Sequence, residues 1–120
     1  MTYGFIKTAC ASPSLKVGDC KFNSEQIISA VKAAAKNGAQ IIVLPELSIT
    51  GYTCGDLFFQ RTLQISAQEA LKEIVAKTKT VNAIVFVGLP LPMTEGIYNC
   101  AAALFKGQLL ALFAKSYLPN

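Results

Sequence analysis

At 120 residues the chain has the length of one domain with a single hydrophobic core. It is 52% hydrophobic and only 15% charged, against roughly 25% charged in a typical globular domain, so we infer that further chain or another subunit covers part of its surface. The net charge of +4 comes from dispersed lysines without interleaved aromatic residues, a pattern that argues against a nucleic-acid partner.

The first half of the chain alternates strand and helix signals. An apolar stretch over residues 3–11 predicts a first strand. Residues 23–26, Asn-Ser-Glu-Gln, offer a polar cap, and the apolar i, i+4 spacing that follows predicts a helix ending at Asn37-Gly38. Residues 39–44 are apolar and β-branched, which predicts a second, buried strand.

The second half predicts one longer helix and a terminal hairpin. Asp56 can cap a short helical segment, and apolar spacing predicts a helix over residues 62–79. Residues 83–89 predict a third strand, and residues 96–105 and 108–114 flank a tight turn as a hairpin. The order β-α-β-α-β-β-β predicts an α/β fold with a mixed sheet, both helices on one face and the other face uncovered.

Cysteine usage and hydropathy indicate which cellular compartment the protein occupies. The four cysteines include no CxxC pair and histidine is absent, so a zinc site would need all four to converge, and we expect no metal. The N-terminus has no secretory h-region, and the longest uncharged stretch, residues 80–94, is too short and too interrupted by proline to cross a bilayer. We therefore expect a cytoplasmic protein with free thiols and no membrane partner.

The sequence LPELSITGY, residues 44–52, is the most informative stretch. Apolar AQIIVL leads into it, and Pro45 cannot donate to a sheet ladder, so Glu46 is predicted to lie where a central strand ends. Ligands and chemistry collect at the carboxyl ends of strands in α/β sheets. A glutamate in this position can also simply cap the next turn.

Lys115 occupies a comparable position after the apolar run GQLLALFA. A lysine after a strand is often only solvated, but an acid and an amine at two strand ends can be two parts of a catalytic constellation. We predict that Glu46 and Lys115 lie at the same edge of the sheet and share a pocket. The third part, a nucleophile, is not evident.

These stretches resemble the nitrilase, or carbon–nitrogen hydrolase, superfamily. LPELSITGY is similar to the glutamate motif of that family, and KSYLP at 115–119 is similar to its lysine motif. GIYNCAAALFKGQLLALFA at 96–114 is similar to the hairpin that leads to the lysine. CGDLF at 54–58 and GLPL at 88–91 look like the glutaminase half of glutamine-dependent NAD synthetases. The resemblance spans nearly the whole sequence.

The resemblance implies a fold and a mechanism. The fold would be the N-terminal part of an α-β-β-α sandwich. Glutamine would be the substrate of a Glu-Lys-Cys triad, with Glu46 as general base, Lys115 stabilising the oxyanion and Tyr52 lining the substrate pocket. This domain would need no cofactor, and the ammonia would pass to a synthetase domain that uses ATP and Mg²⁺ to make NAD.

One part of the family pattern is absent from this sequence. The nucleophilic cysteine of the family follows the lysine motif after another strand, and none of the four cysteines here has that context. Cys54 is close to Glu46 in sequence but belongs to a loop. We therefore expect residues 1–120 to be an incomplete carbon–nitrogen hydrolase domain, inactive alone, that works with the rest of its parent polypeptide in a homo-oligomer.

Three interpretations stay open at this point. The chain is part of a glutamine amidohydrolase domain that supplies ammonia for NAD synthesis. It is part of another branch, a nitrilase, an amidase or a carbamoylase. It is a non-catalytic interaction module of the same fold. Sequence beyond residue 120 would separate the first two, because a synthetase would continue into a nucleotide-binding domain; a chain that is complete in the cell would favour the third.

Overall fold

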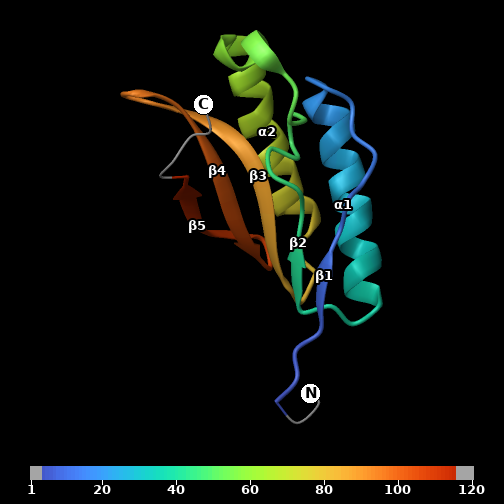
Figure 1. Ribbon diagram of the computed structural model, residues 1–120. Coiled ribbons are helices and arrows are strands. Elements are labelled where there is room, and N and C mark those ends of the chain that lie inside the picture. Colours follow the sequence, from blue (N-terminus) through green and yellow to red (C-terminus); the bar gives the residue numbers. More distant parts are fainter. Residues whose placement is uncertain (1–3, 116–120) are drawn as a thin grey trace.

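The computed structural model describes residues 4–115 as one sheet with two long helices (Figure 1). The elements follow the predicted β-α-β-α-β-β-β order, with a short 3₁₀ helix before the second long helix. Their bounds are β1 (Thr8–Cys10), α1 (Cys20–Lys36), β2 (Ile41–Val43), η1 (Gly55–Phe59), α2 (Arg61–Lys77), β3 (Ile84–Met93), β4 (Gly96–Phe105) and β5 (Gln108–Ala114).

The sheet is mixed, as predicted, and its strand order follows the sequence, β1-β2-β3-β4-β5. Strands β1, β2 and β3 are parallel, because α1 and α2 carry the polypeptide back between them. Strand β4 pairs antiparallel with β3, and β5 pairs antiparallel with β4. Helix α1 packs on β2, α2 packs on β3, and the two helices contact each other, so both cover the same face (Figure 1).

The core lies between the helices and that face of the sheet. On β3 every second side chain points into it, because successive residues of a strand face opposite sides. Helices α1 and α2 contribute residues spaced three or four apart. Fully or almost fully buried side chains from these elements are Ile27, Val31, Ala67, Ile74, Val85, Val87 and Leu89.

Helix α1 begins one turn earlier than the sequence predicted. The cap is Asp19, whose side chain accepts a hydrogen bond from the N–H of Phe22 at 3.0 Å. Asn23, expected in the cap, lies fully buried inside the first turn. Its side-chain oxygen accepts a hydrogen bond from the Lys16 N–H. Its side-chain nitrogen donates to Lys16 O and to Ile49 O at 2.9 Å. The predicted cap was wrong because this long-range contact, rather than local sequence, decides the role of Asn23.

Strand β3 runs past its predicted end at residue 89 and includes Pro90 and Pro92. The N–H and C=O of Gly88 both point to the β2 side of the strand, where they bond the segment that follows β2. Pro90 and Pro92, two and four positions further along the strand, have the same orientation as Gly88. The missing N–H groups of both prolines therefore face away from β4 and cost no ladder bond.

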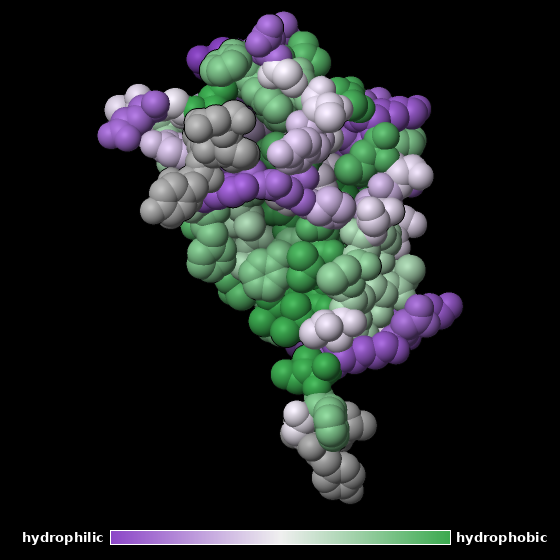
Figure 2. Space-filling model, viewed as in Figure 1, coloured by the Kyte–Doolittle hydropathy of each residue, from purple (hydrophilic) through white to green (hydrophobic). Residues whose placement is uncertain are grey.

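The second face of the sheet has no described helix over it. Side chains on this face include Val43, which is 39% exposed, and Phe113, which is 57% exposed and pairs across the ladder with Ala101. Figure 2 shows apolar side chains gathered into a continuous area over the strands. We call this surface, with Phe86, the open face. Large contiguous apolar areas on a soluble protein usually mark contact with other protein.

We predict that residues 1–120, prepared alone, self-associate through the open face. Sedimentation velocity should show species larger than a monomer, and Phe113→Lys should shift the distribution toward monomer because it places a charge in the contact. Phe59→Lys is the matched control, since Phe59 is 75% exposed on η1, outside the sheet. A wild-type protein that stays monomeric and unfolds cooperatively would contradict the prediction.

Candidate active site

Glu46 lies where the β2–β3 ladder stops. The N–H of Leu44 still donates to Phe86 O at 2.9 Å, one residue beyond β2. Pro45 has no N–H, so the ladder cannot continue, and the backbone turns away at Glu46. The carboxylate is thereby placed at the carboxyl end of a central strand.

The turn that carries Glu46 rests on β3 at Gly88. The Gly88 N–H donates to Ser48 Oγ at 3.3 Å, and the Gly88 C=O accepts from the Ile49 N–H at 3.0 Å. A Cβ at position 88 would lie only 2.4 Å from the Leu47 nitrogen. Leu47 itself has φ of 54°, a left-handed conformation that a branched residue rarely adopts. Close backbone contact with β3 thus holds a strained turn in place.

Lys115 and Asn99 meet Glu46 from the other side of β3. The Lys115 ammonium donates to Glu46 Oε1 at 3.0 Å, and the Asn99 side-chain amide donates to the same oxygen. The backbone N–H of Lys115 donates to Asn99 O at 2.9 Å, which continues the β4–β5 ladder by one residue. The predicted meeting of Glu46 and Lys115 at one edge is confirmed. Asn99, noted in the sequence only as part of the hairpin motif, is brought into the same cluster.

The electrostatics of the cluster favour an ionised carboxylate. The hydrogen bond from Lys115 is the main cause that holds the pKa of Glu46 below its ordinary 4.5, and the Asn99 bond and the Lys115 charge act in the same direction. Partial burial opposes them but does not reverse the shift. Both side chains of the ion pair stay about 40% exposed, at 41% for Glu46 and 42% for Lys115. An ion pair this exposed to solvent adds little stability, and its charged groups are accessible to a ligand.

A cavity of about 350 Å³ surrounds this cluster. Its polar groups are Glu46, Asn99 and Lys115, and its apolar wall is formed by residues of the open face such as Phe86 and Phe113. Convergent polar groups in an apolar cavity are typical of small-molecule sites. Tyr52, predicted to line the pocket, is 58% exposed and is not among the residues that line this cavity.

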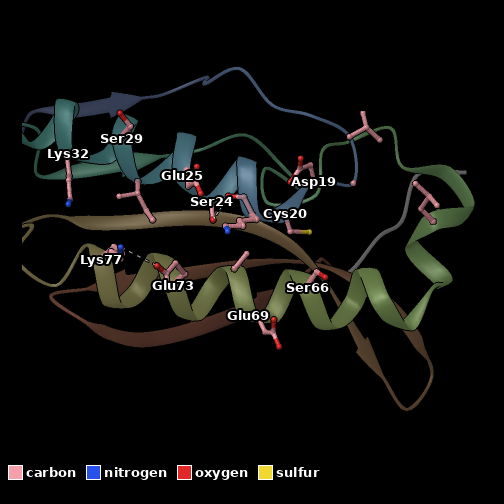
Figure 3. Close-up of a pocket in the computed structure, with 16 residues that line it drawn as sticks. Asp19, Cys20, Ser24, Glu25, Ser29, Lys32, Ser66, Glu69, Glu73 and Lys77 are labelled. Atoms are coloured by element: carbon pink, nitrogen blue, oxygen red, sulfur yellow. Dashed lines mark hydrogen bonds and ion pairs between the residues drawn. The ribbon is translucent and has the colours of Figure 1, made fainter.

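A larger groove of about 1220 Å³ runs between α1 and α2 (Figure 3). Its lining carries charged side chains of both signs, and its ion pair, Lys77 with Glu73 at 3.4 Å, is an exposed i, i+4 contact within α2. Figure 3 shows the labelled acids and lysines spread along both helices rather than gathered at one point. We therefore place the candidate site in the smaller cavity.

The four cysteines are free thiols, and none donates a hydrogen bond to Glu46 in the described part of the protein. Burial is the main cause that raises the pKa of Cys20 to about 11, and burial also raises the pKa of Cys100. Cys54 is buried and donates to Thr50 O at 3.2 Å. Cys20, Cys54 and Cys100 are buried, with Cys100 in the wall of the candidate cavity, and Cys10 is exposed on β1.

Two further observations concern the described residues 4–115 as a whole. No three His, Cys, Asp or Glu side chains among them come together in a way that could hold a metal ion. None of the helices there combines the length and apolar character needed to span a membrane.

Comparison with known proteins gives a consistent result. The carbon-nitrogen hydrolase family matches residues 7–119. The glutamine-dependent NAD(+) synthetase of Mycobacterium tuberculosis is 31% identical over 98% of this chain, and that of Aquifex aeolicus is 33% identical over 96%. The matches cover 17% and 20% of those proteins, so this chain spans about a fifth of their length.

Solved structures share the fold. A glutamine-dependent NAD(+) synthetase from Cytophaga hutchinsonii superposes with a TM-score of 0.88 at 32% identity, covering 96% of this chain and 20% of that one. An amidase from Nesterenkonia sp. superposes with a TM-score of 0.76 at 23% identity, covering 96% of this chain and 44% of that one. The mixed sheet with two helices on one face thus matches part of a nitrilase-like fold, as predicted.

We predict that Gly88→Ala displaces the turn that carries Glu46. The new methyl group would meet the Leu47 nitrogen, so the free energy of unfolding should fall by about 1–3 kcal/mol, as for other overpacked sites. The pKa of Glu46 should rise toward 4.5 as the carboxylate moves away from Lys115, and NMR titration of the carboxyl carbon measures this.

Gly55→Ala is the matched control for this substitution. Gly55 has a left-handed φ of 57° and open space around it, so its variant strains the backbone without a clash. It should lose stability but keep the pKa of Glu46. A Gly88→Ala protein with wild-type stability and an unchanged Glu46 pKa would contradict the role given to the contact.

Proposed function

Because the chain belongs to the carbon–nitrogen hydrolase family, we propose that it forms part of a glutamine amidohydrolase domain that supplies ammonia for NAD synthesis. The observation that carries the proposal is the Lys115–Glu46 pair at 3.0 Å, held at strand ends inside a cavity. Similarity to glutamine-dependent NAD(+) synthetases over nearly the whole sequence supports the choice of amide.

In this proposal the nucleophilic cysteine comes from a segment outside residues 4–115. Glu46 takes the thiol proton, and the thiolate attacks the side-chain amide carbon of glutamine, forming a C–S bond and an oxyanion. The Lys115 ammonium stabilises the oxyanion. When the oxyanion collapses, the C–N bond breaks and Glu46 returns the proton to the departing ammonia, after which water hydrolyses the thioester.

The remaining partners follow from the same proposal. Tyr52 lines the glutamine pocket once the rest of the domain is in place, since it projects from the loop just after the Glu46 turn. ATP and Mg²⁺ act in a separate synthetase domain, and the amidohydrolase domain itself uses no cofactor. The parent polypeptide works in the cytoplasm as a homo-oligomer.

A second candidate is an amidase of another branch of the family, which the superposition on the Nesterenkonia amidase favours. The same carboxylate and ammonium would serve any primary amide. An identity of 23% indicates a shared fold and does not point to a shared substrate. Glutamine therefore remains the first choice of substrate. A non-catalytic module would need neither group.

We predict that Glu46→Gln, made in the full polypeptide that contains residues 1–120, lowers glutamine-driven turnover by about 10²–10⁴-fold, because the general base is lost. Turnover with added ammonia should persist, since ammonia enters after the amide has been cleaved. Steady-state assays with each nitrogen donor measure both rates.

Glu95→Gln is the matched control, because Glu95 is an exposed glutamate in the β3–β4 turn, bonded to Tyr98. It should leave both rates unchanged. Equal loss with both nitrogen donors in Glu46→Gln would contradict a separate amidohydrolase role. Full activity on another amide, and none on glutamine, would select the second candidate.

We predict that residues 1–120 prepared alone release no ammonia from glutamine above background. The reason is that no cysteine thiol among residues 4–115 makes a hydrogen bond to the Glu46 carboxylate. Ammonia release is measured by a coupled dehydrogenase assay on wild type and on Cys54→Ala. Activity that appears in the wild-type protein and disappears in Cys54→Ala would make Cys54 the nucleophile and overturn the assignment.

A further inference from the structure

We propose that Asn99 is a positioning residue that fixes which oxygen of Glu46 accepts the proton during amide cleavage. The inference rests on the proposed function and deepens it. Two donors, the Lys115 ammonium and the Asn99 amide, converge on Oε1 of Glu46. Within residues 4–115, Oε2 accepts no hydrogen bond, so it keeps its lone pairs for the thiol.

Asn99 joins both members of the pair. Its side chain donates to Glu46, while its backbone carbonyl accepts the Lys115 N–H at 2.9 Å. It lies on β4, between β3 and β5, and the next residue, Cys100, is buried. Groups on packed central strands are held more accurately than groups on loops. A single residue of a rigid strand therefore sets where the carboxylate stands relative to the ammonium.

The chemistry of asparagine suits this position. A neutral donor orients the carboxylate without bringing a second positive charge to it. A second ammonium would weaken Glu46 further as a base, although general-base catalysis is most efficient when the pKa of the base is near the working pH. An aspartate would place two carboxylates together, and an aliphatic residue would leave Oε1 with Lys115 alone. Among these side chains, the short amide of Asn99 aligns the Glu46 carboxylate with the smallest loss of its basicity.

Asn99→Ala removes the side-chain bond and leaves the backbone bond to Lys115, so the β4–β5 register is kept. In the full polypeptide, kcat for glutamine should fall by about 10–100-fold, in the range expected for small misplacements of a catalytic group, with little change in KM. The Asn99 bond helps to hold the pKa of Glu46 low, so its loss raises that pKa. The acidic limb of the kcat/KM profile, where Glu46 becomes protonated, should therefore move to higher pH.

Asn99→Asp is nearly isosteric and gives a second measure if the alanine variant does not fold. Its added negative charge should move the acidic limb further up than alanine does. Tyr98→Phe is the matched control on the same strand, because it removes only a hydroxyl bonded to exposed Glu95. It should leave kcat and the acidic limb unchanged.

The outcomes separate this inference from the proposed function. A Glu46→Gln protein that hydrolyses glutamine at the wild-type rate overturns the proposed function. If Glu46→Gln is inactive, and both Asn99 variants keep the wild-type acidic limb, the positioning role is overturned while the proposed function stands. A fall in kcat without a shift of the acidic limb of the kcat/KM profile would also overturn the positioning role, since such a fall would reflect packing alone.

Discussion

The contact between Gly88 and the backbone of Leu47 is the constraint on which the site depends. With no Cβ at this point, the turn after β2 can lie directly against β3, and both backbone groups of Gly88 bond to it. The backbone of a central strand therefore positions the main chain at Glu46, and hydrogen bonds from Asn99 and Lys115 then hold its carboxylate. The backbone contact also sustains the left-handed conformation of Leu47, which would otherwise be unfavourable.

The ion pair at the site contrasts with the rest of the molecule. Core side chains between sheet and helices are almost wholly buried, whereas Glu46 and Lys115 remain about 40% exposed, at 41% and 42%. A pair this wet is weakly stabilising, so stability does not explain why three converging polar groups occupy the end of an apolar face. The proposed catalytic role would account for it, because a substrate needs both the charge and the access.

The sequence predicted the elements well and the contacts between them less well. The hairpin strands 96–105 and 108–114 have the predicted bounds, because the tight turn and apolar runs are local signals. Glu46 and Lys115 could be paired because each follows an apolar strand. The roles of Asn23, Gly88 and Asn99 depend on which residues of distant segments meet, and local pattern carries no such information.

The two prolines near the end of β3 have a consequence for how this protein meets others. Beyond Gly88, no strand among residues 4–115 pairs with the β2 side of β3, although Pro90 there is buried, and unpaired sheet edges can accept a strand from a neighbouring molecule. Pro90 and Pro92 leave that edge with carbonyl acceptors but without the donors of two successive ladder positions. A strand added there would lack half of its backbone hydrogen bonds, so this edge disfavours growth of the sheet into a neighbouring molecule.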